Sequence, residues 1–413
     1  MNSNYKIGAF INMLGMMFTL STTSALAQDI AITNTRIIVG SGQVIENGTI
    51  IVRGGKIDSV VAGSANNAEG LTVIDATGMT AMPGFIDGHK HINTGPDEKG
   101  QMQSLLEAGY TTILSGGGPG DGNITLRDHI NSGLINGPRV IPSERVNLRS
   151  TPEEARAAVR AMAAKGIMHT GEIGLTPEPA PPQAEMEVIK AVVDEAAKLG
   201  VQVNVHSVST PATIAALDAG VRRFVHIPNK DWTGIDDAAK IAAAGAIVAG
   251  LTSFGAPIID RESPAPAPVQ FPQDNSPRFR DGKPWPEAIA GANRDPKGRA
   301  IGNEAGYTIV NARRIWEAGN NTLSYSTDQN YADIVVLEHE LKSLSVMFSQ
   351  ADIIKIMGPN SAAYVGMSSQ IGTLEAGKLA DIILLAGDPR VNIYEMLKTK
   401  VVLKEGKVVV DKR

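Results

Sequence analysis

The chain has 413 residues, of which 43% are hydrophobic and 20% charged, a composition typical of a globular enzyme rather than a disordered segment. Its formal net charge of −5 and its aromatic content of 4% argue against nucleic acid as a partner. The lack of cysteine excludes disulfides, thiolate catalysis and cysteine-bound zinc, so any metal must be bound by histidines and carboxylates. The length is sufficient for one barrel of about 250 residues and a smaller second domain.

Residues 1–27 are predicted to be a signal peptide. Lys6 gives a weakly positive start, residues 7–20 are mostly apolar, and Ala25-Leu26-Ala27 offers a small-x-small cleavage site. A membrane anchor is the alternative, but the apolar run is shorter than the roughly 20 residues that a spanning helix needs. We therefore expect cleavage after Ala27, a protein secreted to the periplasm, and no stable membrane span.

Both ends of the mature chain are predicted to be rich in β-strand. Alternating apolar patterns, separated by turns that contain glycine, occur over residues 30–75 and again over residues 381–410. Two β-rich ends that flank a long middle predict a small β-sandwich domain, built from residues 28–82 and 370–413.

The middle of the chain, residues 83–369, alternates apolar strands with amphipathic helices, which is typical of βαβ units. The predicted strands cover residues 80–86, 111–115, 139–142, 166–172, 201–206, 222–226, 246–251 and 322–327, and the last helices cover 344–348 and 351–363. This α/β pattern predicts a (β/α)8 TIM barrel, whose active site lies at the C-terminal ends of the strands. Residues 254–300, rich in proline, glycine and charge, are predicted to be either a substrate-covering loop or a solvated insertion.

Six side chains that can bind metal fall at the C-terminal ends of these predicted strands. They are His89, His91, Glu172, His206, His226 and Asp328. In an extended chain residues i and i+2 point the same way, so His89 and His91 can face one ion while Lys90 turns aside. His206 and His226 end neighbouring strands about 4.8 Å apart and can share another ion. A single histidine at a strand end is more often a satisfied polar residue, but this coincidence at one barrel rim predicts a metal site.

Other chemistry-bearing residues do not fit this pattern. His129 lies on a predicted surface helix, His339 lies in a charged stretch, and His169 lies inside the fourth strand with a structural role. The glycine-rich segment 115–120 lacks the lysine and the spacing of a phosphate-binding loop, which favours a flexible active-site loop. The sequence has no Gly-x-Ser-x-Gly motif, which weakens a serine-hydrolase interpretation.

Residues 83–91, Pro-Gly-Phe-Ile-Asp-Gly-His-Lys-His, resemble the signature of the amidohydrolase superfamily, and residues 372–382 resemble its return into the small β-domain. The resemblance extends over nearly the whole mature chain. Residues 170–175, 205–207, 224–227 and 359–364 are most similar to the corresponding segments of enamidases, whereas residues 254–300 are not.

The resemblance implies a hydrolase with one or two divalent metal ions. His89 and His91 would bind the more buried ion together with Asp328, and His206 and His226 would bind the second. Many members bridge the two ions with a carboxylated lysine on the fourth strand. Glu172 stands at that place here and could bridge as a carboxylate, although a single-metal site remains open. Zinc is the expected metal, with iron(II) and manganese as alternatives.

The expected reaction is hydrolysis of an amide, lactam or related C–N bond of a small molecule by a metal-activated water. Asp328 is the predicted general base, which then protonates the leaving nitrogen. A periplasmic dipeptidase or N-acyl-amino-acid hydrolase is the nearest alternative. It would need a cation for the substrate carboxylate, for which Arg145, Arg149 and Arg294 are candidates. A non-catalytic binding relative is a more distant alternative, and the sequence leaves open whether the chain forms a homo-oligomer.

Overall fold

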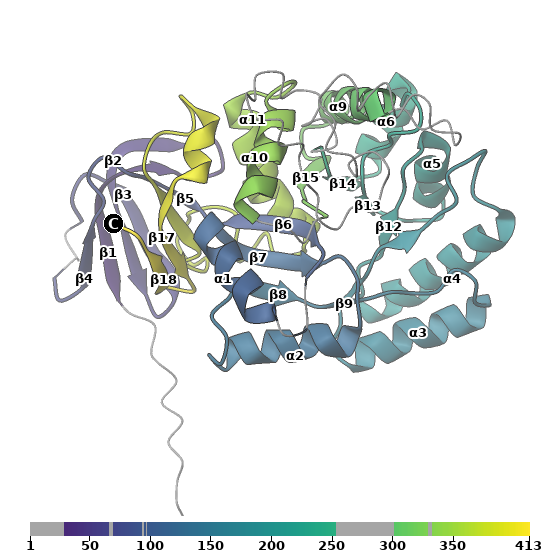
Figure 1. Ribbon diagram of the computed structural model, residues 1–413, viewed down its shortest axis with the longest axis horizontal. Coiled ribbons are helices and arrows are strands. Elements are labelled where there is room, and N and C mark those ends of the chain that lie inside the picture. Colours follow the sequence, from purple (N-terminus) through teal and green to yellow (C-terminus); the bar gives the residue numbers. More distant parts are fainter. Residues whose placement is uncertain (1–28, 66–68, 93–94, 96, 253–300, 329–332) are drawn as a thin grey trace, which may run out of the picture.

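A computed structural model of the chain describes residues 29–65, 69–92, 95, 97–252, 301–328 and 333–413. The chain has an α/β fold, with a β-sheet on one side and parallel strands surrounded by helices on the other (Figure 1). The predicted signal peptide and the predicted loop over 254–300 lie outside the described residues, so both stay predictions.

Strands from both ends of the chain form one eight-stranded sheet, in which strand β4 lies beside β1 and the others follow the order β18-β17-β16-β5-β1-β2-β3. The strands are β1 (Ile30–Ile38), β2 (Val44–Arg53), β3 (Lys56–Ala62), β4 (Thr72–Asp75), β5 (Thr80–Pro83), β16 (Ile382–Leu385), β17 (Thr399–Lys404) and β18 (Lys407–Asp411). Strands near both ends of the described chain therefore lie in one sheet. The predicted two-sheet sandwich is not confirmed, because these strands are joined in a single sheet.

The alternation of side chains explains how this one sheet is buried on two sides. Ile382 and Leu384 belong to an apolar cluster with residues of β1 and β2, whereas Ile383 and Leu385 belong to the main core of the molecule. Successive residues of a strand point to opposite faces, so a strand that is apolar throughout can serve two cores. A second sheet is not needed to cover it.

The chain leaves this sheet at Gly84. The first predicted strand, residues 80–86, is in fact two strands: β5 pairs with β1 and β16, and β6 (Phe85–Lys90) pairs with β7 (Tyr110–Ser115). A Cβ atom at position 84 would lie 2.3 Å from the Cγ2 and Oγ1 atoms of Thr111. The stiff, β-branched threonine cannot give way easily, so glycine is required at this junction.

The parallel strands form three ladders: β6-β7-β8, β9-β10 and β11-β12-β13-β14-β15. Their further bounds are β8 (Arg139–Ile141), β9 (Ser143–Glu144), β10 (His169–Thr170), β11 (Ile173–Gly174), β12 (Asn204–His206), β13 (Arg223–Val225), β14 (Ile247–Gly250) and β15 (Leu323–Tyr325). The pairing is consistent with a TIM barrel, but the described strands are not hydrogen-bonded into a closed ring. Pro142, which has no N–H to donate, separates β8 from β9.

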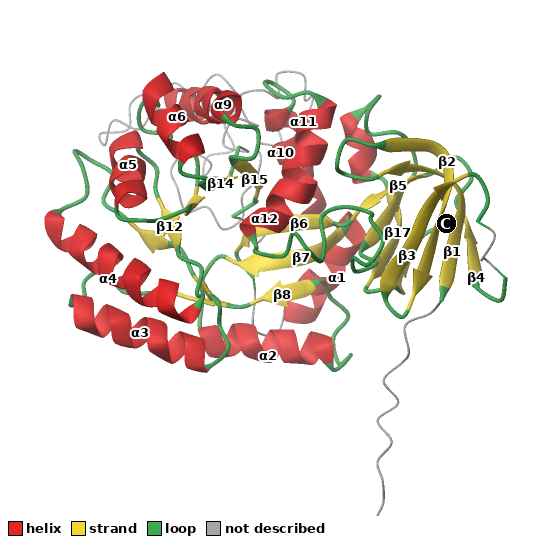
Figure 2. Ribbon diagram, turned by 180° about the vertical axis from the view of Figure 1, so that it is seen from behind, coloured by secondary structure: helices red, strands yellow, loops and turns green. Residues whose placement is uncertain are grey.

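Helices cover the outside of the parallel strands (Figure 2). They are α1 (Glu98–Ala108), α2 (Gly120–Asn131), α3 (Pro152–Ala164), α4 (Gln183–Leu199), α5 (Thr210–Asp218), α6 (Ile235–Ala243), α9 (Ile301–Ala318), α10 (Asp333–Leu344), α11 (Gln350–Lys355) and α12 (Ser361–Tyr364), with a π-helical turn over Ile356–Asn360 and a 3-10 helix over Ile393–Leu397. Among the described helices, none has the length and apolar character needed to cross a membrane.

Helix α10 was not predicted, and the helix predicted over residues 344–348 is wrong, because α10 ends at Leu344 and a turn follows. The buried side of α10 includes His339 and Glu340. Charged and polar residues on a buried face hide the periodic apolar pattern from which a helix is predicted.

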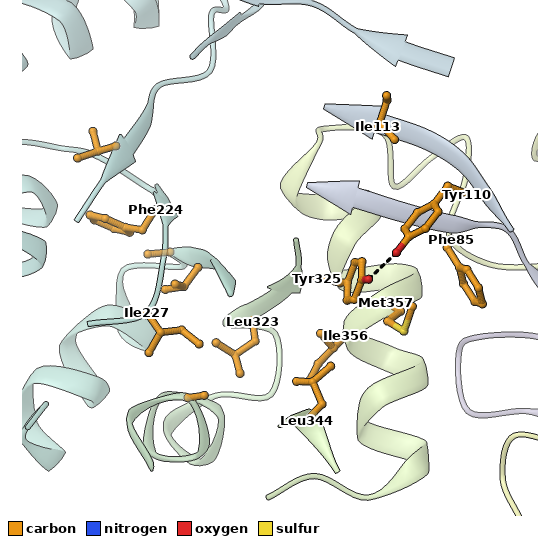
Figure 3. Packing of buried hydrophobic residues seen from close by; sticks show 14 of the residues in the cluster. Phe85, Tyr110, Ile113, Phe224, Ile227, Leu323, Tyr325, Leu344, Ile356 and Met357 are labelled. Carbon is orange, nitrogen blue, oxygen red and sulfur yellow. Dashed lines mark hydrogen bonds between the residues drawn. The ribbon is translucent and has the colours of Figure 1, made fainter. Parts of the chain in front are cut away.

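The main core joins the parallel strands to the helices around them (Figure 3). At its centre the hydroxyl groups of Tyr110 in β7 and Tyr325 in β15 lie 2.6 Å apart, and both side chains are buried. Tyr110 also packs edge-on against Phe85, with ring centroids 5.9 Å apart. These contacts tie β6, β7 and β15 together.

Candidate metal centre

His89 is the last residue but one of β6 and His91 is the first residue after that strand, and both imidazoles are on the same side. The Nε2 atoms of the two rings lie 3.1 and 3.0 Å from the same carboxylate oxygen, Oδ1 of Asp328. His89 is buried, and His91 is about one-third exposed. The i, i+2 spacing in the sequence therefore places the two rings together as predicted.

His206 and His226 come from the neighbouring strands β12 and β13. Their ring centroids are 4.4 Å apart. His206 is the last residue of β12, as predicted, but β13 ends at Val225, so His226 lies one residue beyond its strand. Its φ is +70°, and its N–H donates a hydrogen bond to the carbonyl of Ala249. This left-handed turn directs the imidazole of His226 across the strand ends towards His206.

Glu172 lies between the two histidine pairs, although it does not end a strand as predicted. It falls in the gap between the short strands β10 and β11, where its N–H donates to the carbonyl of Gly116. One carboxylate oxygen is 3.0 Å from Nδ1 of His206 and 3.7 Å from Nε2 of His89, and the other is 3.7 Å from His91. The departure from regular strand geometry thus brings this carboxylate to the middle of the cluster.

Asp328 follows β15 by three residues, with φ of +54°, rather than ending the strand as predicted. Its N–H donates to the carbonyl of His89 at 2.8 Å. Its Oδ2 atom lies 3.8 Å from Nε2 of His226, on the opposite side from its contact with His89. All six residues predicted from the sequence therefore converge.

The two acidic side chains of the cluster are ionised at neutral pH. Burial raises the pKa of Glu172, but hydrogen bonds to His206 and His226 outweigh burial and hold the pKa well below its usual range. Burial likewise raises the pKa of Asp328, while the charge of His226 and the contact with His89 lower it to well below the usual range. Ionised carboxylates are the form that binds metal or accepts a proton.

The donor set fits a divalent metal centre. The candidate ligands form two groups of three residues. One group is His89, His91 and Glu172, and the other is Glu172, His206 and His226. Within each group every residue offers one ligand atom, and these three atoms lie within 4.8 Å of one another. Nε2 of His89 and Oδ1 of Asp328 are buried and lie 3.1 Å apart, but neither makes a hydrogen bond of good geometry to a described residue. Buried polar atoms without hydrogen bonds are costly, whereas imidazole nitrogens and carboxylate oxygens are the ligands that zinc, iron(II) and manganese accept.

Asp87 supports this site, and the sequence interpretation missed it. It is fully buried in β6, and its carboxylate accepts hydrogen bonds from the backbone N–H of His89 and from the N–H and hydroxyl of Thr327. It therefore links the two segments that carry His89 and Asp328. Burial raises the pKa of Asp87 to about 6, although the charge of Lys90 and these hydrogen bonds oppose the rise. The sequence signal that could have identified Asp87 is an acidic residue within a buried strand, because such a residue needs hydrogen-bond or charged partners.

Lys90 turns away from the candidate ligands as predicted, and its own partner was not anticipated. Its ammonium group is 2.6 Å from a carboxylate oxygen of Asp333, the first residue of α10, and both side chains are almost completely buried. This ion pair fixes the start of α10 against β6.

The glycine-rich segment after β7 packs directly on the site. A Cβ atom at Gly116 would lie 2.8 Å from Nε2 of His89, and one at Gly117 would lie 2.8 Å from Nε of Arg145. The segment therefore lies beside the candidate site, and the flexible active-site loop expected here stays a prediction. Its glycines make room for two functional side chains.

Arg145 is the one predicted candidate cation that the structure places at the site. Its guanidinium donates a hydrogen bond of 2.8 Å to Glu172. Arg149 is exposed and does not line the cavity beside the cluster, and Arg294 lies outside the described residues.

The remaining histidines lie away from the six candidate ligands. His169 is buried in β10, as the structural role predicted for it requires, and burial lowers its pKa to about 3. His129 on α2 pairs with Glu98 at 3.4 Å, and His339 is buried in α10.

Comparisons with known proteins identify the family of the chain. Residues 80–409 match the model of the Amidohydrolase family. The N-acyl-D-aspartate deacylase of Alcaligenes xylosoxydans xylosoxydans is 37% identical over 98 residues, which cover 24% of this chain and 19% of that protein. The enamidase of Eubacterium barkeri is 38% identical over 81 residues, which cover 18% of this chain and 19% of that protein. The similarity thus spans only about a fifth of the length of these two relatives.

Solved structures share the fold over the whole length. The structure of molinate hydrolase superimposes with a TM-score of 0.74 at 17% identity, covering 93% of this chain and 95% of that chain. Since the family model matches most of the sequence, from residue 80 to residue 409, the chain belongs to the Amidohydrolase family.

Proposed function

We propose that the chain is a metal-dependent hydrolase that cleaves an amide, lactam or related C–N bond of a small molecule. The observation that carries this proposal is that two three-residue groups of ligand atoms share Glu172 at the C-terminal ends of the parallel strands. Active sites of such α/β folds lie at this end of the strands.

In this proposal His89 and His91, together with Asp328, hold one ion, and His206 and His226 hold a second. Glu172 contacts both histidine pairs and would therefore be a ligand available to both ions. The mixture of nitrogen and oxygen ligands suits zinc, with iron(II) and manganese as alternatives.

Asp328 is the proposed general base. It is ionised at neutral pH, it is about one-fifth exposed, and it lies between the two histidine pairs. A divalent metal bound at this site supplies a water that ionises near neutral pH and an electrophile for the substrate carbonyl. Asp328 would accept a proton from the attacking water and then deliver it to the leaving nitrogen. A C–O bond would form, the C–N bond would break, and the products would be a carboxylic acid and an amine.

The proposal is tested with purified protein that has been stripped of metal and then reconstituted with zinc or manganese. The substrates are anilides, lactams, N-acyl amino acids and dipeptides. We expect hydrolysis of at least one class by the reconstituted protein, and no hydrolysis by the metal-free protein. Activity of the metal-free protein at neutral pH would contradict metal dependence. Metal binding without turnover of any class would instead favour a non-catalytic binding protein.

A further inference from the structure

Arg145 stands at the edge of the candidate metal centre. It directly follows β9, and its guanidinium donates a hydrogen bond of 2.8 Å to Oε1 of Glu172. Its side chain is nevertheless 53% exposed. The group therefore contacts a candidate metal ligand on one side and faces open space on the other.

Two glycines provide a slot for the stem of this side chain. A Cβ atom at Gly117 would lie 2.8 Å from Nε and 3.0 Å from Cγ of Arg145, and a Cβ atom at Gly171 would lie 3.0 Å from the same Cγ. The N–H of Gly171 also donates to the carbonyl of Glu144, which holds the two segments together. The position of the guanidinium is thus set by packing around its stem and not only by its contact with Glu172.

The open side of Arg145 faces a cavity of about 350 Å³. The cavity is lined by Arg145, Val146, Asn147, Leu148, Glu172, Gly174 and His206. It therefore contains two candidate metal ligands and one permanently charged cation. Among the described lining residues, Arg145 is the one lysine or arginine.

The guanidinium has donor capacity beyond its contact with Glu172. A guanidinium carries five N–H donors in a planar fork, and Arg145 makes a single hydrogen bond to the described residues. The fork geometry matches a carboxylate, which it can bind with two parallel hydrogen bonds. An anion that bound there would lie next to Glu172 and His206, and therefore beside the proposed reaction centre.

We propose that Arg145 binds the free carboxylate of the substrate, and that the scissile C–N bond joins an acyl group to the nitrogen of an amino acid. This inference rests on the proposed function. In an N-acyl amino acid or a dipeptide, only the nitrogen and one carbon separate the scissile carbonyl from the carboxylate. Such a substrate can place its carbonyl at the metal centre while its carboxylate contacts Arg145. The products are a carboxylic acid and a free amino acid.

If Arg145 had a purely structural role and only oriented Glu172, its substitution would have different effects. Loss of that role would affect every substrate equally and would lower metal content. Loss of a carboxylate-binding role would affect only substrates that carry the carboxylate. The two roles are therefore separated by pairs of ligands that differ in this one charge.

The experiment compares N-acetylalanine, in its D and L forms, with the neutral N-acetylalaninamide of each form. The proteins are the wild-type chain, Arg145→Met, Arg145→Lys, and Arg149→Met as a matched control. Arg149 lies on the same loop, is exposed, and does not line the cavity. Binding is measured by calorimetry on both metal-free and zinc-loaded protein, turnover is measured on zinc-loaded protein, and metal content is measured for each variant.

We expect Arg145→Met to weaken binding of the acid, and to raise its KM, by about 10- to 100-fold, since hydrogen bonds to charged groups are strong. Binding of the neutral amide and metal content should stay near wild type. Arg145→Lys should recover part of the loss because it restores the charge without the fork. Arg149→Met should behave as wild type.

Two results would overturn the inference while leaving the proposed function intact. One is equal loss for acid and amide in Arg145→Met, together with lower metal content, which would show that Arg145 serves Glu172. The other is a wild-type protein that hydrolyses neutral amides with no preference for the acids. Failure of the zinc-loaded wild type to hydrolyse any amide would instead count against the proposed function, and the calorimetry would still decide whether Arg145 binds the carboxylate.

Discussion

Asp328 is joined to His89 through both backbone and side chain. Its N–H donates to the carbonyl of His89 at 2.8 Å, and its Oδ1 lies 3.1 Å from Nε2 of the same residue. The φ of Asp328 is +54°, in the left-handed region that asparagine and aspartate adopt more readily than other non-glycine residues. The position of the proposed base is therefore fixed by β6 and the residue that follows it, the segment that carries His89 and His91.

Replacement of Asp328 by asparagine should abolish turnover with little change in metal content. Asparagine has nearly the same size and tolerates the left-handed backbone, but it cannot accept a proton at neutral pH. The kcat of Asp328→Asn should fall by at least about 100-fold, the lower end of what general-base catalysis contributes. Turnover is measured on zinc-loaded protein, with metal content measured in parallel. A rate near that of wild type would assign the general base to another residue.

Gly116 and Gly118 provide a matched pair that tests the packing around His89. A Cβ atom at Gly116 would lie 2.8 Å from Nε2 of His89, whereas one at Gly118 would meet only Nδ2 of Asn123, at an ordinary 3.9 Å. We expect Gly116→Ala to displace the imidazole and to weaken zinc binding by about 10- to 100-fold, as changes next to metal ligands typically do. Gly118→Ala should bind zinc as wild type does. Equal zinc affinity in both variants, measured by competition with a chelator, would contradict this packing.

Removal of one partner of the buried ion pair between Lys90 and Asp333 should destabilise the folded protein. Their charged groups are 2.6 Å apart, and their side chains are 1% and 3% exposed. Lys90→Met leaves the charge of Asp333 buried without a partner, which should lower the free energy of unfolding by about 3–5 kcal/mol. The double variant Lys90→Met/Asp333→Asn should recover much of that loss, since it removes both charges. Urea unfolding of the single and double variants measures the coupling, and strictly additive effects would show that the pair contributes nothing.

The burial of His169 should make stability depend on pH. Burial, together with the charge of Arg223, lowers the pKa of His169 from an ordinary 6.5 to about 3. Between these two values the unfolded chain binds a proton that the folded chain does not. The stability that depends on a neutral, buried His169 is fully present above about pH 6.5. As the pH falls from about 6.5 towards 3, the free energy of unfolding decreases by about 1.4 kcal/mol per pH unit.

The variant His169→Asn has no titrating ring at this position. In metal-free protein its free energy of unfolding should therefore fall less between about pH 7 and about pH 5 than that of wild type. Urea unfolding at the two pH values gives the comparison. An identical fall in both proteins would mean that His169 is protonated in the folded state.

The parts of the site that regular structure determines could be predicted from the sequence. His89 and His91 share a face because extended backbone alternates, and His206 ends a strand that the apolar pattern marks clearly. Glu172 and His226 were identified by their proximity to strand ends, but both lie outside their strands. Their final positions depend on irregular backbone and on hydrogen bonds to Gly116 and Ala249, which no periodic pattern reports.

Other features depend on partners that are remote in sequence. The pairing of Lys90 with Asp333 and the choice of Arg145 among the candidate arginines are set by tertiary packing. Likewise, the junction at Gly84 looks like the interior of one continuous strand, and only the position of Thr111 reveals the break. Local sequence could not determine these contacts.

The most direct test is the metal content of the purified wild-type chain, measured by mass spectrometry, together with that of a His206→Asn/His226→Asn variant. The first group of ligand atoms is untouched in this variant, whereas the second loses both imidazoles. We expect close to two divalent ions per wild-type chain and close to one in the variant. Wild-type protein that takes up no divalent ion when zinc or manganese is supplied would contradict the proposed metal centre.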